Sequence, residues 1–272
     1  MASIRVRALS KTFANGKRAL DGVNLDVSSG EMIALIGASG SGKSTLIRHL
    51  TGLLASDTKT ETSIHIGQRP VQERGRIASD VRNVRRTVGV VFQQFNLVGR
   101  LSVLTNVLTG RLGQMPELKG NLGVFSIDDQ RKAMQALSRV GIAETARQRA
   151  STLSGGQQQR AAIARALVQG ARILLADEPI ASLDPASARR VMETLVGINR
   201  EDGITVVVSL HQVEYARRFC PRTVAMQEGR IVFDGPSATL TNTRLRDIYG
   251  SASEELVLPD AADIPDLVPV AA

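Results

Sequence analysis

A glycine-rich segment with one lysine and one serine is the first place in this sequence where side chains could do chemistry. Residues 37–44 read Gly-Ala-Ser-Gly-Ser-Gly-Lys-Ser and fit the pattern G-x-x-x-x-G-K-[ST], between an apolar run at 32–36 and a helical pattern at 43–54. The glycines let backbone N–H groups turn toward an anion, and the helix N-terminus adds partial positive charge. Lys43 is expected to reach the β- and γ-phosphates, and Ser44 to bind Mg²⁺. The segment predicts nucleoside triphosphate binding, but it does not separate a kinase, GTPase, helicase or transport motor.

Two adjacent acids end a second apolar run, residues 173–179, which read Ile-Leu-Leu-Ala-Asp-Glu-Pro. Carboxylates at the end of a buried strand carry a desolvation cost unless they meet a cation. We expect Asp177 to support the Mg²⁺ shell and Glu178 to polarise an attacking water, as phosphoryl transfer requires. The alternative is that one acid caps a following helix.

The histidines differ in their sequence context. His211 follows a third apolar run, residues 205–209, and the carboxyl ends of parallel strands open onto one crevice. The phosphate loop, Glu178 and His211 should therefore converge, with His211 as a γ-phosphate contact and not an inert loop residue. His49 and His65 lack this context, which favours surface or packing roles.

A second glycine-containing segment, residues 153–160, reads Leu-Ser-Gly-Gly-Gln-Gln-Gln-Arg. Ser154 and Gln157 fit a capping box that opens an amphipathic helix, and this role alone accounts for local stability. Gly155 and Gly156, however, leave a second bare helix N-terminus that suits a phosphate. The chain thus has two separate phosphate-binding segments. A head-to-tail homodimer accounts for both, because each ATP would then be held by the phosphate loop of one copy and the Ser154 segment of the other.

These motifs, in this order, resemble the nucleotide-binding subunits of ABC transporters over residues 4–249. The resemblance implies catalytic roles for Glu178 as the base, His211 as the switch histidine, Gln93 and Lys43. It implies Mg²⁺ contacts from Ser44, Asp177 and Gln93. The implied ATP contacts are Phe13, Gly37, Ala38, Ser39, Gly40, Ser41, Gly42, Lys43, Ser44, Thr45, Ser154, Gly155, Gly156, Gln157, Ser182 and Asp184. Phe13 would stack on adenine, and packing against a β edge is its alternative.

Within this superfamily, residues 92–102, 153–160, 176–185 and 209–215 are similar to those of phosphonate-import ATP-binding subunits. The similarity implies an ATP hydrolase of the translocase class at the cytoplasmic face of the cell membrane. Its expected partners are a second copy, multi-spanning permease subunits and, indirectly, a periplasmic or lipid-anchored solute-binding protein. The alternatives are a motor for another small solute (phosphite, phosphate ester or amino acid) and a soluble scaffold or assembly ATPase associated with phosphonate breakdown.

The elements that must position these residues alternate between short apolar runs (32–36, 88–92, 173–176, 205–209) and amphipathic helices. This alternation predicts an α/β fold, a P-loop NTPase (RecA-like) core with a mixed or parallel sheet. Short strands at 4–9 and 23–27 predict an antiparallel edge added to that core. Helical patterns at 101–112, 128–140 and 144–149, with a loop at 116–126, predict an inserted helical subdomain.

The domain organisation follows from these patterns. We expect one nucleotide-binding domain over residues 1–250, with its catalytic core at about 1–95 and 155–250 and the helical subdomain at about 96–154. Residues 251–272 carry five acids, three prolines and no lysine or arginine, which is typical of a flexible tail.

Composition excludes several other classes of protein. The 272 residues are 43% hydrophobic and 22% charged, with no apolar run near the roughly 18 residues that a spanning helix needs and no signal-peptide pattern. The single cysteine, Cys220, excludes an internal disulfide or a multi-cysteine metal site and is expected to be a small buried residue.

The net charge of +8 leaves +13 on residues 1–250 once the acidic tail is set apart. Six arginines against two acids make residues 69–86 strongly basic. This stretch predicts a solvated loop and helix, or an approach to anionic lipid headgroups. Nucleic-acid binding is not expected, because no helix-turn-helix, aromatic platform or zinc pattern accompanies the charge.

Overall fold

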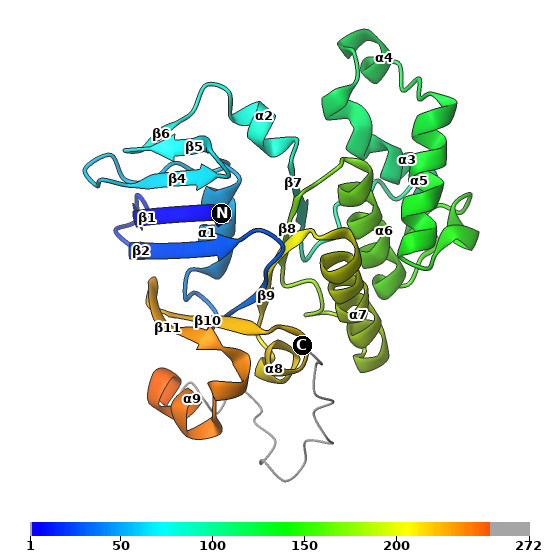
Figure 1. The fold of residues 1–272 in the computed structure, drawn as a ribbon. Coiled ribbons are helices and arrows are strands. Elements are labelled where there is room, and N and C mark those ends of the chain that lie inside the picture. Colours follow the sequence, from blue (N-terminus) through cyan, green and yellow to red (C-terminus); the bar gives the residue numbers. More distant parts are fainter. Residues whose placement is uncertain (1, 251–272) are drawn as a thin grey trace.

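The computed structural model describes residues 2–250, whose strands form two sheets with helices packed around them (Figure 1). The α/β fold class predicted from the alternating patterns is confirmed. The larger sheet has six strands in the order β11-β10-β3-β9-β8-β7, and the smaller has five in the order β2-β1-β4-β5-β6.

The six-stranded sheet contains all four predicted core strands: β3 (Met32–Ile36), β7 (Val88–Val91), β8 (Ile173–Asp177) and β9 (Thr205–Leu210). These strands run parallel, so their carboxyl ends lie at one edge of the sheet. Two further strands, β10 (Arg222–Gln227) and β11 (Arg230–Pro236), were not predicted. β10 continues the parallel arrangement and β11 returns antiparallel to it.

The five-stranded sheet is antiparallel and contains β1 (Ala2–Thr12), β2 (Arg18–Ser28), β4 (Ser63–Ile66), β5 (Arg69–Glu73) and β6 (Arg76–Ile77). The predicted antiparallel β subdomain is confirmed as this separate sheet, and its early strands are longer than predicted. The basic stretch at 69–86 supplies β5, β6 and the short helix α2 (Val81–Arg85), so its description as a loop and helix missed two strands.

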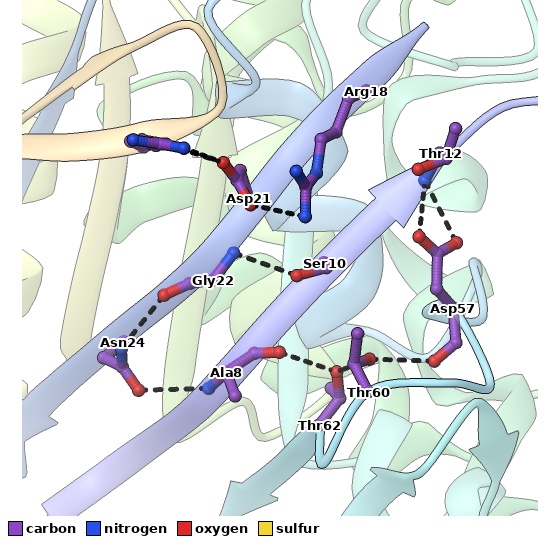
Figure 2. A network of polar contacts seen from close by, with 11 residues as sticks. Ala8, Ser10, Thr12, Arg18, Asp21, Gly22, Asn24, Asp57, Thr60 and Thr62 are labelled. Atoms are coloured by element: carbon purple, nitrogen blue, oxygen red, sulfur yellow. Dashed lines mark hydrogen bonds and ion pairs between the residues drawn. The ribbon is translucent and has the colours of Figure 1, made fainter. Parts of the chain in front are cut away.

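Polar contacts tie the five-stranded sheet together where β1 departs from regular pairing (Figure 2). Ala8 has a positive φ of 46°; its N–H donates to Asn24 and its carbonyl accepts from Thr62. The Thr12 N–H donates to both carboxylate oxygens of Asp57, at 3.0 Å each. The turn that follows Thr12 is thereby anchored at its base.

The alternation of side chains along β3 divides the apolar interior in two. Ile33 and Leu35 join one cluster with β1, β2 and helix α1 (Lys43–Leu50), whereas Ala34 and Ile36 join the other with α6 (Gly155–Val168) and α7 (Pro185–Asp202). The strand that leads into the phosphate loop is therefore buried on both faces and gives the loop a rigid base.

The helical region inserted between β7 and β8 contains α3 (Val103–Leu108), α4 (Glu117–Asn121), α5 (Ile127–Arg139) and the start of α6, with the 3₁₀ segments Thr109–Gln114, Ala143–Thr145 and Ala150–Thr152. In Figure 1 it lies on the opposite side of the parallel sheet from β1 and β2. The remaining elements are α8 (Val213–Phe219), a 3₁₀ turn (Ser237–Thr239) and α9 (Asn242–Tyr249).

Three local predictions were wrong. The predicted loop at 116–126 contains α4, and the predicted helix at 144–149 is a 3₁₀ turn followed by a bridge between Arg149 and Ser102. Helix α1 ends at Leu50 instead of residue 54, because Gly52 has a positive φ of 64° and the Arg85 guanidinium binds the carbonyls of Thr51 and Gly52. The predicted helix at 101–112 is α3 continued as a 3₁₀ helix.

None of the helices in residues 2–250 combines the length and the apolar character needed to cross a bilayer. The acidic segment 251–272, expected to be flexible, lies outside the described residues.

Candidate nucleotide-binding site

The phosphate loop occupies residues 37–42, between the end of β3 and the start of α1. Gly42 has a φ of +109°, and a Cβ at this position would lie 2.7 Å from the Ala19 carbonyl oxygen. Only glycine therefore fits here without moving the strand beside it. The first N–H groups of α1 face the loop and lack partners within the helix, which favours an anion.

Lys43 is buried within this loop, with 4% of its surface exposed. Its Nζ donates to the carbonyl oxygens of Gly37 at 2.7 Å and Ala38 at 3.2 Å. Burial lowers the pKa of Lys43, and the nearby carboxylates of Glu178 and Asp177 partly oppose this effect. The ammonium group is held inside the loop by weak acceptors that phosphate oxygens could replace.

Oxygen ligands from the start of α1 and from the ends of β8 and β9 meet beside the loop. The Ser44 hydroxyl donates to Asp177 Oδ1 at 3.0 Å, and the Ser209 hydroxyl donates to the same oxygen at 2.8 Å. Asp177 and Ser209 are opposite each other in the register of β8 and β9. Hydroxyl and carboxylate oxygens are the donors that Mg²⁺ prefers, so the two sequence-predicted residues Ser44 and Asp177 fit that ion.

Glu178 and His211 form the second polar pair at this edge of the sheet. His211 Nε2 lies 2.6 Å from Glu178 Oε1, and the Glu178 N–H donates to the Ser209 hydroxyl at 2.8 Å. Glu178 has a φ of +50°, an uncommon conformation for a residue other than glycine. Such strain at the end of a strand is typical of a functional residue.

The Ser154 segment forms the capping box that its sequence predicts. The Ser154 hydroxyl accepts from the Gln157 N–H at 3.3 Å, and Gln157 Oε1 accepts from the Ser154 N–H at 2.9 Å. The segment borders a hollow of about 280 Å³ that also contains Arg160, Ser187 and Arg190. Within the described chain, residues 154–157 share no hydrogen bond with residues 37–45, so the structure does not join the two predicted phosphate sites in one copy.

The other predicted contacts lie around these two regions. Gln93 and Ser182 are exposed, whereas Phe13 is half-buried in the turn between β1 and β2 with Lys11 Nζ 6.0 Å from its ring centroid. Asp184 caps α7 by accepting from the Ser187 N–H at 2.9 Å, and its hydrogen bonds with Ser187 lower its pKa. The Thr45 carbonyl accepts from the His49 ring.

Two predictions about residues outside the site are confirmed by their burial. His49 has no exposed surface and packs inside the molecule. Cys220 is 2% exposed, and burial raises the pKa of its thiol to about 12, so it behaves as a small apolar residue. His65 lies in β4 with Nε2 at 3.5 Å from Glu73.

Sequence reasoning missed Ser209, which accepts from Glu178 and donates to Asp177. It begins one of the segments similar to phosphonate-import subunits, but no role was assigned to it, and the pairing of β9 with β8 is what brings it between the two acids. A hydroxyl at the end of a strand whose carboxyl end was predicted to open onto the same crevice as the acidic strand was the one available signal.

Comparison with known proteins decides the family. A family model described as ABC transporter matches residues 20–181, which is more than half of the chain. The chain belongs to the ABC transporter family. The predicted resemblance and the predicted P-loop NTPase core are thus confirmed, and the chain is a nucleotide-binding transporter ATPase.

Similar curated proteins cover nearly the whole length of this ABC ATPase. The Phosphonates import ATP-binding protein PhnC of Stutzerimonas stutzeri is 62% identical over 92% of this chain and 90% of its own length. The protein of the same name from Paraburkholderia xenovorans is 57% identical over 97% of this chain and 87% of its own.

Solved cassettes of the family share its fold. A dimeric ATP-binding cassette, MJ0796, bound to ADP and Pi matches with a TM-score of 0.71 and 33% identity over 86% of this chain and 98% of its own. The cbiO1 protein of Clostridium perfringens, described as part of the ABC transporter complex cbiONQ, matches with a TM-score of 0.75 and 29% identity over 94% of this chain and 96% of its own.

Proposed function

We infer that this ABC ATPase is the ATP-hydrolysing subunit of a phosphonate importer. The observation that carries the chemistry is the convergence of Ser44, Asp177, Glu178 and His211 at the carboxyl ends of the parallel strands. The solute class rests on relatives at 55–62% identity whose names describe phosphonate import.

The ligand-binding roles follow from the geometry of the loop. Lys43 exchanges the carbonyls of Gly37 and Ala38 for phosphate oxygens, while the free N–H groups of residues 37–45 bind the same oxygens. Ser44 and Asp177 hold Mg²⁺, with Gln93 as a further contact from the exposed loop after β7. When bound, Mg²⁺ neutralises phosphate charge.

Hydrolysis depends on the paired Glu178 and His211. The Glu178 carboxylate accepts a proton from the attacking water, and Ser209 fixes its backbone through the bond to its N–H. His211, 2.6 Å from that carboxylate, orients it and contacts the γ-phosphate. The alternative that an acid here only caps a helix has less support, because the residue that caps α7 is Asp184.

A second copy of the chain completes each site. Ser154, Gly155, Gly156 and Gln157 contribute a helix N-terminus that faces out of the subunit, and Ser182 and Asp184 flank it at the start of α7. In a head-to-tail dimer this segment contacts the ATP that the opposite phosphate loop holds, and Phe13 stacks on its adenine. A dimeric relative of this fold is known bound to ADP and Pi.

The membrane subunits dock beside the helical subdomain, which we place at residues 96–154 within a cassette of residues 1–250. A cavity of about 570 Å³ lies between α2, the 3₁₀ segment Thr109–Gln114 and α6, with four arginines (Arg82, Arg85, Arg86, Arg165) in its lining. In the segment that follows Gln114, four apolar side chains are 55–74% exposed: Leu118, Leu122, Val124 and Ile127. An apolar surface of this kind marks an interaction site.

Docking on the membrane subunits places the chain at the cytoplasmic face of the membrane. It then meets the solute-binding protein only through the permease, and it has no nucleic-acid partner.

Substitution of Glu178 by glutamine tests this function. The Glu178→Gln chain should bind ATP with unchanged affinity and hydrolyse it roughly 10²-fold more slowly, because the amide cannot accept the proton of water. The measurement is phosphate release and nucleotide binding by purified wild-type and variant chains. Full hydrolysis by the variant would contradict the assigned base.

A further inference from the structure

Lys17 brings a second ammonium group to the rim of the phosphate loop, from the turn between β1 and β2. A Cβ built on Gly40 would lie 3.5 Å from Lys17 Nζ, and both residues are exposed. The loop thus has one lysine buried within it, Lys43, and another at its exposed rim that comes from the five-stranded sheet.

The backbone on both sides of Lys17 is held in place. A Cβ on Gly42 would lie 2.7 Å from the carbonyl oxygen of Ala19, so β2 packs directly on the loop two residues after Lys17. Within the turn, the Phe13 N–H donates to the Lys17 carbonyl at 2.9 Å, and the Lys17 N–H donates to Asn15 Oδ1 at 3.1 Å. The side chain therefore starts from a fixed point beside the loop.

The ammonium group of Lys17 forms no hydrogen bond and no ion pair within residues 2–250. The cations next to it in the turn are already in use. Arg18 pairs with Asp21 at 2.7 Å (Figure 2). Lys11 Nζ donates to the Ala55 carbonyl at 2.7 Å. The unpaired charge of Lys17 is thus free to attract an anion that enters the loop.

The charge balance of the site favours such a cation. A bound nucleoside triphosphate, together with the carboxylates of Asp177 and Glu178, carries more negative charge than Lys43 and one Mg²⁺ neutralise. A further positive charge at the rim lowers the free energy of the bound phosphates.

We propose that Lys17 is a nucleotide-binding residue whose ammonium group attracts the phosphates from the rim of the loop and sets the affinity for both ATP and ADP. An attraction that is equal in the bound substrate and in the transition state lowers KM and leaves kcat unchanged. Lys17 therefore acts on binding, whereas Glu178 acts on proton transfer. This inference rests on the proposed binding of a nucleotide at residues 37–45.

Nucleotide affinity of the purified full-length chain tests this role. In Lys17→Met, the Kd values for ATP and ADP should each rise about fivefold, as loss of one exposed charge pair allows. The affinity of this variant should also fall less steeply with added salt than that of wild type, because one attracting charge is gone. Lys17→Arg keeps the charge and should restore most of the affinity and the salt dependence.

Arg18→Met is the matched control, because Arg18 is the next residue and is also exposed, but its guanidinium is paired with Asp21. Asp21 keeps Arg230 as a partner at 2.6 Å in this variant. Its nucleotide affinity and salt dependence should stay within twofold of wild type.

Steady-state hydrolysis separates binding from catalysis, since KM for ATP should rise in Lys17→Met with little change in kcat. Wild-type affinity and salt dependence in Lys17→Met would overturn the proposal. Equal losses in Arg18→Met would also overturn it, because they would show that the fold of the turn matters and not the charge of Lys17. Absence of ATP binding by the wild-type chain would instead refute the proposed function.

Discussion

His49 is a buried imidazole one turn after Thr45 in α1, and it makes stability depend on pH. Its Nδ1 lies 2.8 Å from the Thr45 carbonyl oxygen, which can only accept, so Nδ1 carries the hydrogen. Burial lowers the pKa of His49 below its ordinary value of 6.5, and hydrogen bonds with the backbone of Thr45 and Ala55 oppose this effect only in part; the charges of Lys11 and Asp57 have smaller, opposite effects. The folded chain therefore keeps the ring neutral.

The expected result is a loss of stability in acid. Because the unfolded chain binds the proton more readily, the free energy of unfolding should fall as pH drops below about 6.5 toward the lower folded pKa, and no loss should arise above 6.5. His49→Leu removes this titration, so its unfolding free energy should change less between pH 7.5 and 5. Urea unfolding at several pH values measures both chains, and equal pH slopes would contradict the prediction.

The place of a single residue in the site could be predicted from the sequence where a motif lies at or after the end of a predicted strand. Lys43 and Ser44 belong to the loop motif that follows the apolar run 32–36, and Asp177, Glu178 and His211 lie at or just after the ends of the other two apolar runs. Parallel pairing of these strands was therefore enough to bring the residues together. Ser209 and Lys17 could not be found this way. Ser209 meets partners 31–32 residues away through strand register, and Lys17 lies beside the phosphate loop only because β2 packs on it.

At the scale of elements, the N-terminus of α5 depends on one capping box. The Ser126 hydroxyl accepts from the Asp129 N–H at 3.0 Å, and Asp129 accepts from the Ser126 N–H and hydroxyl and from Arg111. The bonds from Ser126, followed by those from Arg111, lower the pKa of Asp129. The box thus joins α5 to the 3₁₀ segment beside the arginine-lined cavity.

Ser126→Ala should lower the free energy of unfolding by about 1 kcal/mol at pH 7, because it leaves helix N–H groups without a partner. The cost should shrink as Asp129 is protonated in acid, since the stability contributed by a carboxylate with a lowered pKa is complete above its ordinary pKa and is lost as pH falls from there through the lowered pKa of the folded chain. Ser138→Ala, at an exposed position of the same helix, is the control and should change stability by less than about 0.5 kcal/mol. Equal effects of both substitutions would exclude the capping role.

Elements were predictable in proportion to their apolar content. The four mainly apolar runs became β3, β7, β8 and β9. Strands β4, β5 and β6 escaped notice because they are only two to five residues long and alternate or mix apolar residues with polar ones: serine and histidine in β4, and arginine, glutamine or glutamate in β5 and β6. Helix α4 escaped because Pro116 and Gly120 read as breaks, although proline is tolerated before the first turn of a helix. The segment 144–149 lacks the length to form a helix without support and instead pairs with Ser102.

At the scale of the whole molecule, the exposed leucines in and directly after α4 should mediate assembly and not folding. Leu118 and Leu122 are 74% and 69% exposed, one helical turn apart. The double substitution Leu118→Gln/Leu122→Gln should leave the unfolding free energy within about 0.5 kcal/mol of wild type. Recovery of co-expressed membrane subunits with the tagged chain should fall at least fivefold. Val232→Gln, on β11 and 43% exposed, is the control, and equal recovery with all three chains would place the interface elsewhere.

The central claim is that this chain uses ATP hydrolysis to import a phosphonate. The most direct test is uptake of a labelled phosphonate by cells that lack the chain and carry either the wild-type or the Glu178→Gln form, with phosphate and phosphite uptake measured in parallel. The account predicts phosphonate uptake with wild type alone and no difference for phosphate. Phosphonate uptake that is independent of the chain, or equal with both forms, would contradict it.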